Sequence, residues 1–91
     1  MNNIKENMEA KLGADKAAIL GLLTRRPKGT YTDDVASLLG MNFDRVRILL
    51  HGLKDEGKAE FTTVEYKDLP GAIQSKVRPG MSRCLWKVGL V

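Results

Sequence analysis

The sequence predicts an α+β domain in which helices come first and a pair of strands follows. Up to residue 56, apolar residues recur at spacings of three and four, the period of an amphipathic helix. After residue 57 the chain is rich in β-branched and aromatic residues that alternate with polar ones. With 91 residues, 43% hydrophobic and 29% charged, the chain suffices for one small globular domain.

Several classes of protein do not fit this composition. The lone cysteine, Cys84, excludes an intrachain disulfide, and with the single histidine it cannot complete a zinc site. No nucleophile stands at an activating spacing, so we expect no enzymatic activity, metal or cofactor. No apolar run approaches the roughly 20 residues of a membrane span, and "MNNIKENMEA" lacks a secretory h-region. We therefore expect a cytoplasmic chain that binds no membrane.

The first segment, residues 1–13, is predicted to form a separate helix. Ile4, Met8 and Leu12 recur every four residues and form a narrow apolar stripe, and Gly13 is expected to end the helix. A helix this thin in apolar residues needs a docking partner, either the body of the domain or a second copy. It is therefore a candidate dimerisation element, set apart from the main domain at 14–91.

Two helices are predicted next. "ADKAAILGLLTRRPKG" is predicted to place Ala17, Leu20 and Leu23 on an apolar face, with Ile19 beside them, and to end at Pro27 and Gly29. After a short extended piece at 30–31, Thr32 is expected to cap a two-turn helix. The buried face of that helix is predicted to be Val35, Leu38 and Leu39, and Gly40 ends it.

The helix at 42–56 has the strongest pattern. Asn42 is the predicted N-cap, Val46, Leu49, Leu50 and Leu53 stand at spacings 0, 3, 4 and 7, and Gly57 ends the helix. Strands are predicted over 58–66 and 82–88, with Trp86 in the core. The loop between them, residues 67–81, carries basic residues. In the C-terminal third, five cations stand against Asp68 alone: Lys67, Lys76, Arg78, Arg83 and Lys87.

This order of elements resembles the winged helix-turn-helix family. The residues that carry the resemblance are the "LLG" ending at Gly40 and the pattern V-x-x-[LI]-L-x-x-L-x-x-x-G from Val46 to Gly57. The resemblance implies a three-helix core, a two-stranded hairpin whose loop (67–81, here called the wing) contacts a ligand, and an extra N-terminal helix. It also implies sequence-specific binding of double-stranded DNA, as in small transcriptional regulators, with helix 42–56 in the major groove.

On that reading, the outward residues of helix 42–56 contact DNA. Arg47 is the first candidate for a bidentate contact to guanine, Arg45 for a phosphate, and Ile48 for a thymine methyl. His51 is expected at the groove edge, and Phe43 also points outward. The full predicted set is Asn42, Asp44, Arg45, Arg47, Ile48 and His51 on the helix, Thr32 before it, and Lys67, Lys76 and Arg78 in the wing.

Asp44 has two interpretations. It is a first-turn acid favoured by the helix dipole, or it accepts a hydrogen bond from cytosine N4. Thr32, at the start of its helix, is expected to make a weak phosphate contact. The wing cations are expected to reach the backbone or the minor groove, although a solvated basic loop that touches nothing explains them as well.

The state of assembly and the class of partner stay open. Proteins of this type usually bind as two-fold dimers with half-sites about 34 Å apart, so a homodimer through Ile4, Met8 and Leu12 is expected, with no small-molecule effector. The alternative to DNA binding is a protein-interaction adaptor that uses Phe43 and Ile48 as an apolar patch. Single-stranded nucleic acid lacks support because the aromatic residues, 5% of the chain, are mostly assigned to the core.

Overall fold

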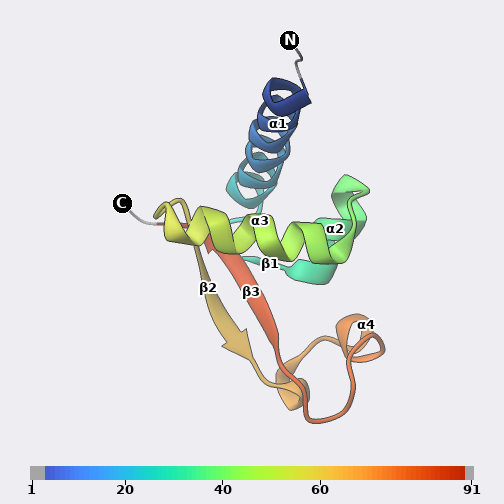
Figure 1. Cartoon of the computed structure of the whole chain (residues 1–91). Helices are drawn as coiled ribbons and strands as arrows, with labels where there is room; N and C mark the ends of the chain where they lie inside the picture. Colours follow the sequence, from blue (N-terminus) through green and yellow to red (C-terminus); the bar gives the residue numbers. More distant parts are fainter. Residues whose placement is uncertain (1–3, 90–91) are drawn as a thin grey trace.

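The computed structural model describes the backbone of residues 4–89 and the side chains of residues 11–89. Within that range the chain is α+β, with four α-helices and a three-stranded antiparallel sheet (Figure 1). The elements run in order α1 (Ile4–Arg25), β1 (Thr30–Tyr31), α2 (Thr32–Leu39), α3 (Phe43–Asp55), β2 (Ala59–Val64), a 3-10 turn η1 (Tyr66–Asp68), α4 (Gly71–Gln74) and β3 (Arg83–Val88). The α+β prediction is confirmed.

The sheet has the strand order β1-β3-β2, so the last strand lies between the two earlier ones. In β2 and β3 the pairing runs from Ala59 opposite Val88 to Val64 opposite Arg83. The short strand β1 pairs Thr30 with Trp86 and Tyr31 with Leu85. Gly29 (φ 105°) precedes β1 and lies so close to Leu85 that a Cβ there would stand 2.7 Å from its Cγ, which explains the glycine.

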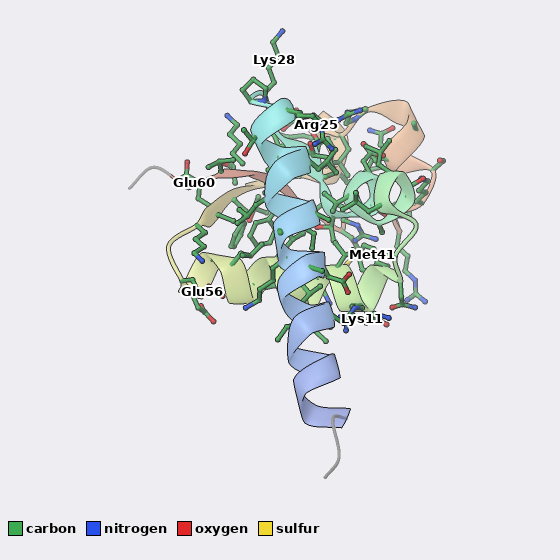
Figure 2. The ribbon with its side chains drawn as sticks, turned by 90° about the horizontal axis from the view of Figure 1, so that it is seen from above. Lys11, Arg25, Lys28, Met41, Glu56 and Glu60 are labelled. Atoms are coloured by element: carbon green, nitrogen blue, oxygen red, sulfur yellow. The ribbon has the colours of Figure 1, made fainter. Side chains whose placement is uncertain are left out.

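Helix α1 is continuous over 22 residues, so the predicted end at Gly13 is wrong. A glycine inside a helix costs about 1 kcal/mol relative to alanine, and the Ala-rich run from Ala14 to Ala18 offsets that cost. Residues 11–14 are exposed, and Figure 2 shows this half of α1 extending beyond the rest of the chain. Leu12 is 39% exposed. The side chains of Ile4 and Met8 lie outside the described residues.

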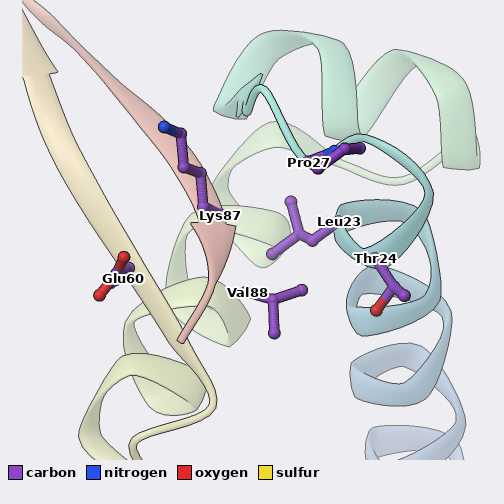
Figure 3. Close-up of a pocket in the computed structure, with 6 residues that line it drawn as sticks. All are labelled: Leu23, Thr24, Pro27, Glu60, Lys87 and Val88. Atoms are coloured by element: carbon purple, nitrogen blue, oxygen red, sulfur yellow. The ribbon is translucent and has the colours of Figure 1, made fainter. Parts of the chain in front are cut away.

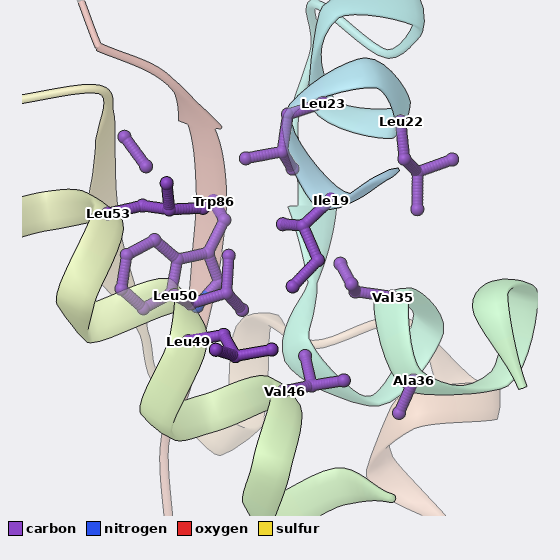
Figure 4. Packing of buried hydrophobic residues seen from close by; sticks show 11 residues of the cluster. Ile19, Leu22, Leu23, Val35, Ala36, Val46, Leu49, Leu50, Leu53 and Trp86 are labelled. Atoms are coloured by element: carbon purple, nitrogen blue, oxygen red, sulfur yellow. The ribbon is translucent and has the colours of Figure 1, made fainter. Parts of the chain in front are cut away.

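One hydrophobic cluster joins α1, α2, α3 and the sheet (Figure 4). Trp86 on β3 is 1% exposed and packs among side chains that include Ile19, Leu23 and Leu50. The predicted inner face of helix α3 is confirmed, because Val46, Leu49, Leu50 and Leu53 are all buried. This cluster fixes one side of α3 and leaves its other side at the surface.

The predicted inner face of α2 is wrong in part. Leu38 is 51% exposed, whereas Thr32, Val35 and Ala36 are buried and Leu39 is half-buried. These four inner positions have the spacing 0, 3, 4 and 7, so the buried face begins at Thr32, the first residue of α2. Thr32 is accordingly the first helical residue and not the cap. The N-cap is Tyr31, whose side chain makes no capping hydrogen bond.

The wing is structured and has a hydrophobic cluster of its own. Leu69, Ile73 and Val77 are buried there, and the half-buried side chains of Tyr31, Val64 and Tyr66 pack against them. In Figure 1 the β2–β3 hairpin runs away from α3, and α4 lies beside the far end of the hairpin, on the side of α2. The segment predicted as an irregular loop therefore folds into η1 and α4 and rests on the body through Tyr31.

Candidate functional site

The surface side of α3 carries a basic stripe. Arg47, His51 and Lys54 stand at spacings of four and three and therefore lie along one side of the helix. The side chain of Arg47 is 52% exposed. The His51 ring meets Phe61 edge-on with 5.8 Å between centroids, and Lys54 Nζ lies 5.9 Å from the same ring. Because Phe61 belongs to β2, the stripe faces the hairpin.

The strand β2 extends this surface towards the wing. Thr63 is two residues beyond Phe61 and so points to the same side of the sheet. Thr63 also lines an open depression at the base of the wing together with Glu65, Tyr66 and Lys67. Lys67 therefore lies next to Thr63 at the base of the wing, and Phe61 and Thr63 separate it from the stripe along β2. Glu65 lies 3.7 Å from the Lys67 ammonium group and partly neutralises it.

The first turn of α3 is built as the sequence predicted. The Asn42 side chain accepts hydrogen bonds from the backbone N–H groups of Asp44 and Arg45 at 2.9 and 3.2 Å, which confirms it as the N-cap. Asp44 is 77% exposed, and one of its oxygens lies 3.9 Å from Arg47 Nε. An ion pair this long and exposed stabilises the fold little, so Arg47 is free to exchange Asp44 for another partner.

Arg45 does not belong to the basic stripe. Its guanidinium donates two hydrogen bonds to one Asp15 oxygen of α1, from Nε at 2.9 Å and from Nη2 at 2.6 Å. The Asp15 side chain is only 17% exposed. The predicted phosphate contact of Arg45 is therefore not in place: this side chain joins α3 to α1 instead. The sequence could not show this pairing because the two residues are 30 positions apart.

Thr32 is also turned inward. It is 4% exposed, and its hydroxyl accepts a hydrogen bond of 3.0 Å from the Trp86 indole N–H. A buried hydroxyl with this partner is not available to a phosphate, so the expected contact is wrong for the side chain. The cause is the same one-residue shift that puts Thr32 on the inner face of α2.

The wing cations remain at the surface. Lys67, Lys76 and Arg78 are exposed, and Lys76 and Arg78 form no ion pair with any described residue. Their backbone is held by the wing cluster, since Val77 between them is buried. The wing therefore displays these charges from a packed segment.

Ile48 and Leu38 are among the exposed apolar residues that lie outside the basic stripe. Ile48 on α3 is 62% exposed, and Leu38 at the end of α2 is 51% exposed. Phe43, which was expected to point outward, is half-buried and packs against the main cluster. The Arg83 guanidinium lies over its ring at 5.4 Å. The apolar patch predicted for Phe43 and Ile48 is therefore reduced to Ile48.

Two further features of the described chain are a depression beside α1 and the thiol of Cys84. A depression of about 420 Å³ between α1 and the sheet is lined by Leu23, Thr24, Pro27, Glu60, Lys87 and Val88 (Figure 3), and it holds no histidine or cysteine. Burial raises the pKa of the Cys84 thiol, an effect that Arg83 partly opposes, so its thiolate is scarce at neutral pH. Residues 11–89 contain no cluster of three or more potential metal ligands.

Comparison with known proteins assigns no family. The chain matches no protein-family model, and no curated protein shows significant similarity to it. None of the helices in the described part of the chain is both long and apolar enough to cross a membrane.

Proposed function

We propose that the chain is a winged helix-turn-helix protein that binds double-stranded DNA and has no catalytic role. The observation that carries this proposal is the basic stripe of Arg47, His51 and Lys54, which continues across Phe61 and Thr63 to Lys67. The B-DNA major groove is about 12 Å wide and admits one helix. The Arg47 side of α3 is proposed to enter it while the wing follows the phosphate backbone.

Arg47 is proposed as the base-reading residue, and Lys54, Lys67, Lys76 and Arg78 as backbone contacts. Ile48 is proposed to touch a thymine methyl and His51 to lie at the groove edge. Asp44 lies within reach of Arg47, and a base is proposed to replace it as the partner of Arg47. Its wide exposure also leaves it able to accept a hydrogen bond from cytosine, the second interpretation of this residue.

The proposal is tested by fluorescence anisotropy with a labelled random duplex over a range of salt concentrations. The logarithm of the binding constant is expected to fall linearly with the logarithm of salt concentration, with a slope near −0.9 for each phosphate neutralised. Absence of binding at micromolar protein, or binding that ignores salt, would contradict the proposal.

The role of Arg47 is tested on a duplex chosen from a random pool. Arg47→Ala is expected to weaken binding to the selected duplex by about 1–3 kcal/mol and to relax its sequence preference. Lys87→Gln is the matched control, because it also removes one exposed cation, near the end of β3 that is distant from the wing. Equal losses in the two variants would reduce the role of Arg47 to general charge.

The homodimer stays part of the proposal through the N-terminal half of α1, with Leu12 exposed there and Ile4 and Met8 on the same predicted stripe. A two-fold dimer would place two half-sites about 34 Å apart. The second candidate function is a protein-interaction adaptor, which the exposed Ile48 favours. Binding to duplex DNA separates the two functions, because an adaptor would not bind it. If the chain binds DNA, Ile48→Ser is expected to change the sequence preference at one base pair, because it removes the thymine contact.

A further inference from the structure

The side chain of Arg83 joins three elements at the base of the wing. Arg83 is the first residue of β3, opposite Val64, the last residue of β2. Its Nε donates a hydrogen bond of 2.9 Å to Asp33 in the first turn of α2. Its guanidinium also stacks over Phe43, the first residue of α3, at 5.4 Å from the ring centre. One side chain thus connects the wing base with the starts of both helices.

Burial distinguishes this ion pair from most other charged contacts of the chain. The side chains of Arg83 and Asp33 are 23% and 10% exposed, whereas those of Lys67 and Glu65 are 76% and 71% exposed. A half-buried pair is screened less by salt than an exposed one. Arginine also suits this place better than lysine, because its planar group forms a directed hydrogen bond and stacks on an aromatic ring at once.

We propose that Arg83 is a positioning residue that fixes the orientation of the wing relative to α3. Among the described residues, the contacts between wing and body include the apolar contact of Tyr31 with the wing cluster and the contacts of Arg83. An apolar contact alone sets distance but little direction, whereas the hydrogen bond and the stacking set direction. Arg83 therefore acts through the wing cations and does not itself need to touch a ligand.

This inference rests on the proposed function only for its consequence in DNA binding, and the orientation itself is measured without DNA. Spin labels at Asp55→Cys on α3 and Ala72→Cys on α4, both exposed sites, in a Cys84→Ser background give the distance distribution between helix and wing. The distribution is expected to be narrow in the parent and broad in Arg83→Gln. Lys87→Gln, with the same change of net charge on the same strand, is expected to leave it narrow.

The partner variant Asp33→Asn separates positioning from charge. It makes the chain more positive, so electrostatics alone predict tighter DNA binding. Positioning predicts the opposite: a broadened distance distribution and an affinity loss that shrinks when Lys67, Lys76 and Arg78 are already replaced by alanine, because coupled sites are not additive. Tighter binding by Asp33→Asn with a narrow distribution would overturn the inference.

Folding controls keep the result interpretable. If Arg83→Gln lowers the melting temperature but leaves the distribution narrow, Arg83 is merely a structural residue and the inference fails. If Arg83→Gln does not fold, Arg83→Lys retains the charge and loses the stacking, and a partial broadening is then the expected result. A broad distribution in a chain that binds no DNA would retain the positioning role and remove the proposed function.

Discussion

At the scale of single residues, two threonines beside Trp86 have opposite hydrogen-bonding states. Thr32 accepts the indole N–H at 3.0 Å. Thr30, opposite Trp86 on β1, is 2% exposed, and its hydroxyl has no hydrogen-bond partner among the described residues. The two residues are equal in size and similar in burial, so they form a matched pair for measuring what one buried hydrogen bond contributes.

Thr32→Val is expected to lower the free energy of unfolding by about 1–3 kcal/mol, because it leaves the buried indole N–H unpaired. Thr30→Val is expected to be neutral or stabilising, because it removes a buried hydroxyl that lacks a partner. Urea unfolding followed by the fluorescence of Trp86, the chain's single tryptophan, measures both. A larger loss in Thr30→Val than in Thr32→Val would contradict this account of the interior.

At the scale of elements, the sequence predicted α3 well and the wing poorly, for a physical reason. The apolar residues of α3 continue over two turns between an Asn cap and a glycine, so local pattern and tertiary burial agree. In the wing, Leu69, Ile73 and Val77 also recur every four residues, but Pro70, Gly71 and Pro79 indicate turns. The contact with Tyr31 that makes their burial worthwhile is 38 or more positions away and invisible in the sequence.

Replacement of an apolar wing residue is expected to loosen the wing without unfolding the body. Ile73→Ala should raise the hydrogen-exchange rates of amides in residues 66–82 and leave those of α3 protected, because local openings need only local contacts. Leu50→Ala in the main cluster should instead lower global stability by about 2–5 kcal/mol. If Ile73→Ala speeds exchange equally in both regions, the wing and the body form one cooperative unit.

Two glycines, one within α1 and one after its end, are expected to respond oppositely to alanine. Gly13 is exposed, and a Cβ added there would meet no atom within 4 Å, so Gly13→Ala should stabilise that part of α1 by about 1 kcal/mol. Gly29→Ala should destabilise the fold, because its φ of 105° and the nearby Leu85 both disfavour a side chain. Helix content by circular dichroism and the melting temperature check both changes.

At the scale of the whole molecule, two ion pairs connect α1 with the two ends of α3. Asp15 pairs with Arg45 near the start of α3, and its neighbour Lys16 pairs with Glu56 just after its end. These pairs, like that of Arg83 with Asp33, join residues 30 or more positions apart. The sequence therefore predicted α2, α3 and much of the main core, but it divided α1 at Gly13 and missed α4. The partners of Arg45 and Arg83 depended on the angles between helices. The sequence lacks any local signal for such angles.

The pair with Glu56 predicts a dependence of stability on pH. Hydrogen bonds from Lys16, and then from Lys58, hold the pKa of Glu56 below its ordinary value of 4.5. The stabilisation is therefore complete above about pH 4.5 and is lost as the pH falls through the lower folded-state pKa. As the pH is lowered from about 6 to about 3, the urea midpoint should decline slightly, and this decline should be smaller in Glu56→Gln. An unchanged decline in that variant would assign it to other carboxylates.

The two hydrophobic clusters share no residue, and this separation has a consequence for how the protein can change over time. Mutations in the wing can therefore alter its charge and shape without disturbing the packing of the main cluster. A wing of different sequence could therefore be grafted onto the same body, provided that it keeps its contacts with Tyr31 and Arg83. The architecture thus allows new partner preferences to evolve without a new fold.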